Sequence, residues 1–306
     1  MLKYTAKRIL MLIPTIIGIT LFIYLIMSLV PGDPAELLSP PEATAEEVEA
    51  LRVELGLDKP ILVQYLTYMW NILHGDFGVS WFTQQPVIDE IVSRMPYTLS
   101  LGIYSTLIAS IISIPLGTLT AVKHNTLPDY LLTFLCLVFA AMPNFWLGII
   151  LQINLSLETG WFPAYGMGTL QHYVLPVIAV CAASVANNIR STRTWVLDVI
   201  RSDYVRTARA KGASEVVVIM KHALRNALLP IVTGLGSSFA GVLGGSVVIE
   251  TVFAIPGIST YLTSAVKTRD MPIIMGCILV ISVFVGVVNL LVDLMYSVID
   301  PRVKYE

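Results

Sequence analysis

Residues 271–292 read MPIIMGCILVISVFVGVVNLLV, and no charged side chain interrupts them. A helix needs about 20 apolar residues to cross the hydrocarbon core of a bilayer. Because lipid offers no hydrogen-bond partner to the backbone, such a stretch must be helical or belong to a closed barrel. Barrel strands are about ten residues long and alternate apolar with polar side chains, which this stretch does not. It therefore predicts a transmembrane helix.

Five further stretches are apolar and free of charge. They are Ile9–Val30, Tyr97–Val122, Tyr130–Leu157, Tyr173–Ile189 and Ala227–Ile249. Over the whole chain, hydrophobic residues make up 56% and charged residues 13%, whereas a typical soluble domain is about 25% charged. A soluble protein has too little interior to bury this much apolar surface. We therefore expect an all-α polytopic membrane protein with six transmembrane helices.

The stretch nearest the N-terminus, Ile9–Val30, predicts an uncleaved helix and not a signal peptide. Its apolar run is longer than the usual run of about 7–15 residues, and no cleavage site of small residues follows it. The three cysteines, Cys136, Cys181 and Cys277, all fall within apolar stretches. They are too few for a disulfide framework, so we interpret them as packing residues.

Positive charge predicts the orientation of the helices, because cytoplasmic connections carry an excess of lysine and arginine. The chain has 19 lysine and arginine residues. The connections on one side of the predicted membrane spans carry Arg52, Lys59, Arg94, Lys267 and Arg269. All others lie on the opposite side, eight of them between residues 190 and 228. We therefore expect both termini and the 190–228 connection in the cytoplasm, and the 31–96 connection outside. The formal net charge of −2 gives no support for a nucleic-acid partner.

The outer connection, residues 31–96, predicts short helices. Thr44 followed by Glu47 resembles a capping box, which begins a helix from Ala45 to about Leu55. A second segment, Ile61–Leu73, follows Pro60 and has apolar residues at helical spacing. The connection could serve as a docking surface or lid, or only as a structural cap. His74 and Asp76 alone do not make a set of metal ligands.

The inner connection predicts a short helix from Tyr204 to Lys211, preceded by a capping Ser202 or Asp203 and stopped at Gly212. Ser214 then caps a second helix, Glu215–Ala227. Eight basic residues could serve only to attract anionic lipid. Such attraction needs no particular order of residues, however, whereas two capped helices indicate a shaped surface for a protein partner.

Residues 204–214, YVRTARAKGAS, and residues 222–230, HALRNALLP, resemble the cytoplasmic EAA loop of ABC importer permeases. They are most similar to the version in the oligopeptide, dipeptide and nickel permease family, in particular its dipeptide-permease B-type chains. The general loop has Glu-Ala-Ala where this chain has Arg206-Thr207-Ala208, a departure typical of this subfamily. Further matches in family order are Val30–Pro34, Gly56–Pro60, Gly75–Gly78, Met142–Trp146, Gly244–Glu250 and Asp300–Arg302.

The resemblance implies a type I ABC importer permease fold in a bacterial inner (cytoplasmic) membrane. It implies three segments: 1–30 with the first transmembrane helix, 31–96 outside the cytoplasm, and a 97–306 core with the cytoplasmic loop at about 190–228. The partners would be a second, homologous permease chain, two ATP-binding subunits and an extracytoplasmic substrate-binding protein. ATP and Mg would bind to the partners, and this chain would need no cofactor. The predicted contacts to the ATP-binding subunit are Asp203, Tyr204, Arg206, Thr207, Ala208, Arg209, Lys211, Gly212 and Ala213.

A second candidate site lies inside the membrane. Gly241 and Gly245 form a Gly-xxx-Gly pair, which lets helix backbones approach closely. The pair could serve packing within the chain, or it could lie on the translocation pathway at the interface with the partner permease. The candidate residues for that second role are Asn144, Gly241, Gly244, Gly245 and Glu250.

Other function classes find less support in the sequence. No Gly-x-Ser-x-Gly, His-Glu-x-x-His or phosphate-binding Gly-x-x-x-x-Gly-Lys motif is present, so we expect a transport subunit and no enzyme. A carrier driven by ions would require charged side chains in the middle of the membrane, and the six apolar stretches have none. Peptides are the expected substrates, and nickel or a metal chelate is the alternative. No metal site is predicted.

Overall fold

The computed structural model describes residues 2–299, with side chains from residue 5 to residue 295. The predicted closing motif Asp300–Arg302 therefore lies outside the described residues. Within residues 2–299 the regular structure is helical, and the one β-type pairing is an isolated bridge between Val79 and Pro86. The all-α fold class is confirmed.

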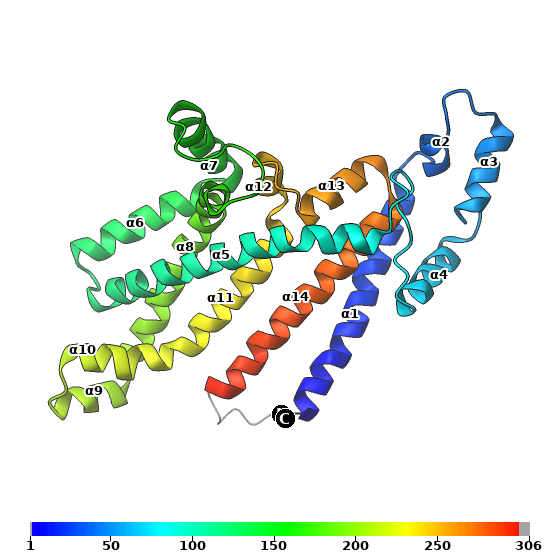
Figure 1. The fold of residues 1–306 in the computed structure, drawn as a ribbon. Coiled ribbons are helices and arrows are strands. Elements are labelled where there is room, and N and C mark those ends of the chain that lie inside the picture. The colour runs from blue at the N-terminus through cyan, green and yellow to red at the C-terminus, as the bar shows by residue number, and fades with distance from the viewer. Residues whose placement is uncertain (1, 300–306) are drawn as a thin grey trace. The chain divides into compact units, whose positions relative to one another are not determined.

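The chain divides into two compact units, each described by itself (Figure 1). The first, called here the terminal unit, consists of Ala6–Pro96 and Pro256–Gly286. The second, called the central unit, consists mainly of Tyr97–Ile255 and the part of the last helix from Val287 onward. Two long helices, α5 (Val87–Val122) and α14 (Met271–Ile299), contribute to both units.

The terminal unit contains the predicted short helices. Its other elements are α1 (Leu2–Leu29), α2 (Pro34–Leu38), α3 (Ala45–Glu54), α4 (Ile61–Leu73) and α13 (Ile258–Thr268). The capping box is confirmed, because Glu47 N–H donates to the Thr44 hydroxyl and Thr44 N–H donates to the Glu47 carboxylate. The bounds of α4 are the predicted ones. Buried Val87, Ile91, Ile274 and Cys277 form the core of this unit.

The central unit is built around α8 (Leu170–Ile200), which packs against α6 (Leu127–Ala141), α7 (Asn144–Leu151) and α11 (Arg225–Gly245). Buried Leu101, Leu175, Val180 and Phe253 lie in its core. The remaining elements are η1 (Gln152–Glu158), α9 (Asp203–Ala210), α10 (Glu215–Val217), η2 (Val218–Leu224) and α12 (Val247–Val252), where η marks a π-helical segment.

Five helices among the described residues are long and apolar enough to span a membrane. They are Thr5–Leu29, Val87–Val122, Leu170–Ile200, Glu215–Gly245 and Met271–Met295. The sixth predicted span, Tyr130–Leu157, is a bent pair of helices, because α6 and the helix Asn144–Glu158 meet at 93°. Pro143 causes the break: a residue before proline avoids the helical region, and Met142 has extended backbone angles of φ −76° and ψ 126°.

The predicted end of the second loop helix at Ala227 is wrong. The backbone stays helical through the junctions of α10, η2 and α11, so one helix runs from Glu215 to Gly245. Pro230 lies inside it, and membrane helices tolerate proline where side chains satisfy the freed carbonyls.

Backbone that leaves the helices next to η1 is hydrogen-bonded by buried side chains. The Gln152 amide donates to the carbonyl oxygens of Ala164 at 2.7 Å and Val252 at 3.3 Å. The Ser156 hydroxyl donates to the carbonyl oxygen of Phe162 at 2.6 Å. These bonds join the 159–169 connection to α12 and keep its polar groups paired.

An ion pair joins α6 to α8 next to the basic connection. The Arg193 guanidinium donates two hydrogen bonds to Asp129, at 2.7 and 2.8 Å. It donates a third to His124 Nδ1 at 2.9 Å, and His124 follows the end of α5. The Asp129 side chain is only 2% exposed. The pair therefore connects the end of α5 and the start of α6 to α8, the helix that leads into α9.

We expect Asp129→Ala to destabilise the protein strongly, by about 3 kcal/mol, because removing one partner of a buried pair leaves the other charge uncompensated. The Arg193 side chain is 25% exposed, so water can partly solvate its charge once Asp129 is removed. We therefore expect a loss of stability at the lower end of the range for broken buried ion pairs. The measurement is the thermal unfolding midpoint of the purified protein in detergent.

The double variant Asp129→Ala, Arg193→Met should recover most of that midpoint, since it removes both charges. Asp203→Ala is the matched control, because the Asp203 side chain is fully exposed and lies 3.8 Å from Arg206. A single Asp129 variant that melts like the wild type would show that the pair contributes no stability.

Candidate functional site

Helix α9 begins and ends within one residue of its predicted bounds, Tyr204 and Lys211. Ser202 has extended backbone angles at the N-cap, φ −71° and ψ 152°, and the helix runs from Asp203 to Ala210. At the other end Gly212 has φ +79°, a conformation that glycine adopts without strain. Gly212 N–H donates to the Arg209 carbonyl at 2.9 Å and Ala213 N–H to the Ala208 carbonyl at 3.3 Å. This pair of bonds is a Schellman motif, so the stop at Gly212 is confirmed.

One face of α9 is buried against the helices beside it. Val205 is fully buried and Ala208 is 8% exposed. Both pack with Val218 on η2, and with Val199 on α8. Val205 and Ala208 are three residues apart, so they share one side of the helix. This apolar contact fixes α9 to the beginning of the long Glu215–Gly245 helix.

The opposite face of α9 is polar and exposed. Tyr204 is 47% exposed, and the side chain of Arg206 is 76% exposed. Of the predicted contact residues, Ala208 is buried and Ala213 is half-buried, while the rest of the set is exposed. Ala208 and Ala213 therefore support the helix, and the exposed members form the surface that a partner could reach.

Arg209 is exposed, but its charge is already paired within the chain, which makes it less available to a partner. Its guanidinium donates to both carboxylate oxygens of Glu215, at 2.6 and 3.1 Å. These hydrogen bonds raise the pKa of Arg209 above its ordinary value. The pair connects α9 to the first residue of α10, a structural role that the sequence did not reveal. Within the described part of the chain, Arg206 has only the looser contact with Asp203 at 3.8 Å, so its charge is more available to a partner.

An apolar groove lies next to these helices in the central unit. It has a volume of about 500 Å³ and is lined by α5 residues such as Ile114 and Leu119 and by Val216, Ile219 and Met220. Glu215 also lines it. Hydrophobic side chains thus line both sides of the groove where α5 and the loop helices meet.

The glycines of the second candidate site are exposed and have open space around them. A methyl group added at Gly241, Gly244 or Gly245 would meet no atom of the described residues within 4 Å. Gly234 and Gly236, by contrast, pack tightly against Trp195 and Val292. The Gly-xxx-Gly pair is therefore not used for packing inside the described chain. Asn144 is the exposed first residue of α7.

Glu250 differs from the rest of that set because it is fully buried. Its Oε1 atom accepts hydrogen bonds from the Thr98 hydroxyl at 2.8 Å and from the Ser246 hydroxyl at 2.9 Å. A buried carboxyl group is expensive unless it is hydrogen-bonded. Glu250 thus ties α12 to α5, and it is not exposed to a solute in this conformation.

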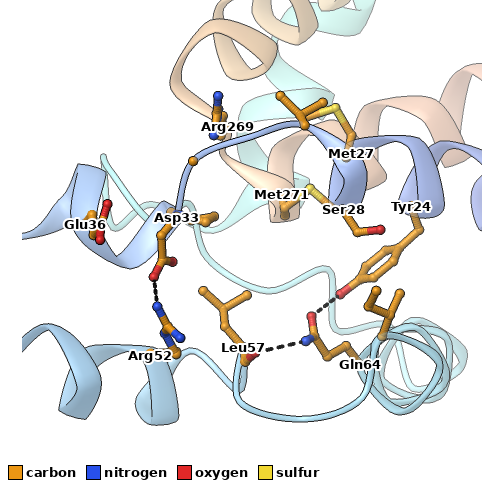
Figure 2. Close-up of a pocket in the computed structure, with 14 residues that line it drawn as sticks. Tyr24, Met27, Ser28, Asp33, Glu36, Arg52, Leu57, Gln64, Arg269 and Met271 are labelled. Carbon is orange, nitrogen blue, oxygen red and sulfur yellow. Dashed lines mark hydrogen bonds and ion pairs between the residues drawn. The ribbon is translucent and has the colours of Figure 1, made fainter.

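The terminal unit has a pocket of its own, with a volume of about 490 Å³ (Figure 2). Arg52 on α3 and Asp33 before α2 form an ion pair on one side, and the hydrogen bond raises the pKa of Arg52. On the other side the Tyr24 hydroxyl donates to the Gln64 side-chain oxygen at 2.8 Å. Figure 2 also shows the Gln64 amide donating to the Leu57 carbonyl oxygen, at 3.3 Å. The pocket therefore has polar groups at opposite sides and apolar walls between them.

Sequence reasoning missed the Asp129–Arg193 pair, although a signal existed. Asp129 stands directly before one predicted span and Arg193 shortly after the next, so both fall at the same side of the membrane on consecutive helices. His74 and Asp76, dismissed as metal ligands, make other contacts. His74 Nδ1 lies 2.9 Å from the Trp70 carbonyl oxygen, and Asp76 accepts from Gly78 N–H.

Comparisons with known proteins agree with this geometry. Residues 113–305 match the family described as binding-protein-dependent transport system inner membrane component, and residues 1–102 match the N-terminal family of such membrane components. The glutathione transport system permease protein GsiC of Escherichia coli (strain K12) is 43% identical over 306 residues, which cover 100% of both chains.

Two solved structures share the fold. The inward-facing MetNI methionine ABC transporter has a TM-score of 0.57 at 16% identity, covering 70% of this chain and 98% of that chain. An amino acid ABC transporter has a TM-score of 0.53 at 16% identity, covering 71% of this chain and 95% of that chain. The chain belongs to the family of binding-protein-dependent transport system inner membrane components, and it is a permease subunit of an ABC importer in the bacterial inner membrane, not an enzyme.

Proposed function

We propose that this chain forms half of the translocation pathway of an ATP-driven peptide importer. The other half is a second, homologous permease chain, and the substrate arrives on an extracytoplasmic binding protein. Two cytoplasmic subunits bind ATP and Mg and hydrolyse the nucleotide, while this chain carries no cofactor. The observation that carries the proposal is the two-sided construction of α9, which is apolar toward its own chain and charged toward the outside.

The exposed face of α9 is the proposed contact with an ATP-binding subunit. The residues proposed to make or support it are Asp203, Tyr204, Arg206, Thr207, Ala208, Arg209, Lys211, Gly212 and Ala213. Aromatic and arginine side chains such as Tyr204 and Arg206 are the types that dominate the energy of protein interfaces. The Schellman stop at Gly212 gives this short helix a defined end.

Movement of α9 would reach the membrane through two connections. Val205 and Ala208 pack on Val218, and Arg209 is bonded to Glu215. Both contacts act on the same continuous helix, which runs on to Gly245. Closure of the ATP-binding subunits would thus displace a helix that enters the bilayer, and so exchange inward- and outward-facing states.

The exposed glycines on α11 are the proposed contact with the second permease chain. Small residues let membrane helices approach closely, and the space beside Gly241, Gly244 and Gly245 is open in this chain. Asn144 and the Glu250 region are proposed to lie near the same pathway. Glu250 would hold α12 in place through Thr98, without touching the solute in the conformation described.

Peptides are the proposed substrates. The relative at 43% identity is a permease for glutathione, which is a short peptide, and it matches this chain over its full length. A nickel or metal-chelate importer of the same family is the alternative. Binding assays on the substrate-binding protein encoded with this chain, with short peptides and with Ni²⁺ as probes, would distinguish the two.

Arg206→Glu should weaken the association with the ATP-binding subunits at least about tenfold, equivalent to 1.4 kcal/mol. Among the residues that the structure describes, the exposed Arg206 side chain has only the 3.8 Å contact with Asp203, so we expect the change to leave the fold intact. The measurement is the amount of ATP-binding subunit that co-purifies with the permease, together with ATPase activity stimulated by the loaded binding protein.

Two further variants sharpen this test. Lys221→Glu makes the same charge change at an exposed residue of the same connection that is not on α9, so it should leave assembly unchanged. If Lys221→Glu is as harmful as Arg206→Glu, the connection is only a basic patch for anionic lipid. The pair Arg209→Glu, Glu215→Arg restores the internal ion pair, and recovery in it would assign Arg209 a structural role.

Gly245→Leu should reduce co-purification of the second permease chain while ATP-binding subunits remain attached, because a large side chain keeps helices apart at a close contact. Val248→Leu is the control, since Val248 is also exposed and lies nearly one turn further along the chain. Unchanged recovery of the second permease with Gly245→Leu would remove α11 from the proposed interface.

A further inference from the structure

Helix α4 is apolar on almost all its sides. Its thirteen residues, ILVQYLTYMWNIL, include no charged side chain. A run of about 10–14 apolar residues is too short to cross a bilayer and is typical of a buried, re-entrant or interfacial helix. The neighbouring α3, by contrast, is a water-facing helix with no buried residue and several carboxylates. Helix α3 is thus suited to water, whereas α4 is suited to an apolar environment.

The inward face of α4 is bonded to the middle of α1. Tyr65 is 4% exposed, and its hydroxyl donates to the Ile17 carbonyl oxygen at 3.1 Å. The same hydroxyl lies 2.9 Å from the Thr20 hydroxyl oxygen, and the Tyr24 hydroxyl donates to Gln64 (Figure 2). The rings of Tyr24 and Tyr65 also make an edge-to-face contact at 5.7 Å. Contacts of α4 therefore reach along α1 from Tyr24 to Ile17.

These contacts fix the depth of α4. Along a helix that rises about 1.5 Å per residue, Thr20 lies about 18 Å from Arg8 and about 14 Å from Leu29, the last residue of α1. The hydrocarbon core is about 30 Å thick. It must lie between Arg8, which is charged, and Leu29, where α1 ends. Thr20 therefore lies near the centre of the bilayer. A helix bonded to Thr20 and Tyr24 lies within the hydrocarbon and not above it.

The outward face of α4 suits that depth. Leu62, Leu66, Trp70 and Leu73 follow one another at intervals of four, four and three residues, so they form one row on the helix. Their exposed fractions in the described structure are 61%, 63%, 63% and 77%. In water such a row would be a large unfavourable apolar surface. In the hydrocarbon it continues the apolar surface of α1, whose spanning window is only 6% buried.

The backbone at both ends of α4 makes hydrogen bonds within the protein. Before the helix, the Gln64 amide donates to the Lys59 carbonyl oxygen at 2.7 Å. After the helix, Gly75 has φ +81°, and Asp76 N–H donates to the Asn71 carbonyl oxygen at 3.0 Å. His74 and Gly75 donate to the last turn in the same way. Paired backbone is the condition for any segment at membrane depth.

We propose that α4 is a re-entrant helix, inserted beside α1 into the leaflet where α1 ends, with lipid acyl chains covering the Leu62–Leu66–Trp70–Leu73 row. The charge distribution predicts that this is the outer leaflet. The inference does not rest on the proposed substrate or on the proposed partners. It narrows the water-exposed part of the outer connection to the segments around α2, α3 and residues 74–86, which are the parts that a binding protein can reach.

The test uses spin labels on the assembled transporter in liposomes. Single cysteines replace Leu66 or, as the matched control on α3, Val53, which is 55% exposed. The three native cysteines, all buried, are first changed to alanine. Collision with oxygen, which concentrates in lipid, and with a water-soluble nickel chelate is then measured at each label. We expect the ratio of oxygen to nickel collisions to be several-fold higher at position 66 than at position 53.

Two results would overturn the proposal. A label at position 66 that collides mainly with the nickel chelate would place α4 in water. A label with low collision rates for both reagents would show that protein, such as the second permease chain, covers the row. If the cysteine-free protein fails to assemble, quenching of Trp70 fluorescence by brominated lipid, taken as the difference between wild type and Trp70→Phe, gives the same decision.

Discussion

The need to pair every backbone polar group inside hydrocarbon governs this structure. Water is absent there, so each N–H and C=O must find a partner within the protein. Long helices meet this need by themselves, and the remaining segments meet it through side chains. Gln152 and Ser156 donate to carbonyl oxygens of the 159–169 connection, and Gln64 donates to the turn before α4. The non-helical segments near the spans therefore occur where polar side chains can reach them.

Charges inside the protein follow the same rule. Glu250 is fully buried and accepts hydrogen bonds from two hydroxyl groups on α5 and before α12. Asp129 is held by Arg193 at the ends of α6 and α8. Both carboxylates hold helices together, and neither lies open to a solute. By contrast, Arg206 on α9 is exposed, with its side chain 76% accessible, so its charge can meet a protein partner.

Local features could be predicted from the sequence because they depend on a few neighbouring residues. The capping box at Thr44, the bounds of α4 and the stop at Gly212 are of this kind. Proline at position 143 indicates a kink in its span, but the 93° size of the bend and the continuous Glu215–Gly245 helix were not predicted. Composition alone gives an apolar run but not the angle of a bend, and Pro230, a residue that usually ends a helix, lies inside a continuous one here. The depth of α4 depends on Tyr65 meeting α1, a contact between residues 45 positions apart in the chain.

The proposed function depends on α9 being the place where ATP-binding subunits act on this permease. The most direct measurement places a photo-crosslinking amino acid at Tyr204, an exposed residue of α9, in the assembled transporter, with Lys221 as the control position. The account predicts a crosslink from position 204 to an ATP-binding subunit, with none or far less from position 221. Crosslinks from position 204 only to lipid, or equal crosslinking from both positions, would contradict it.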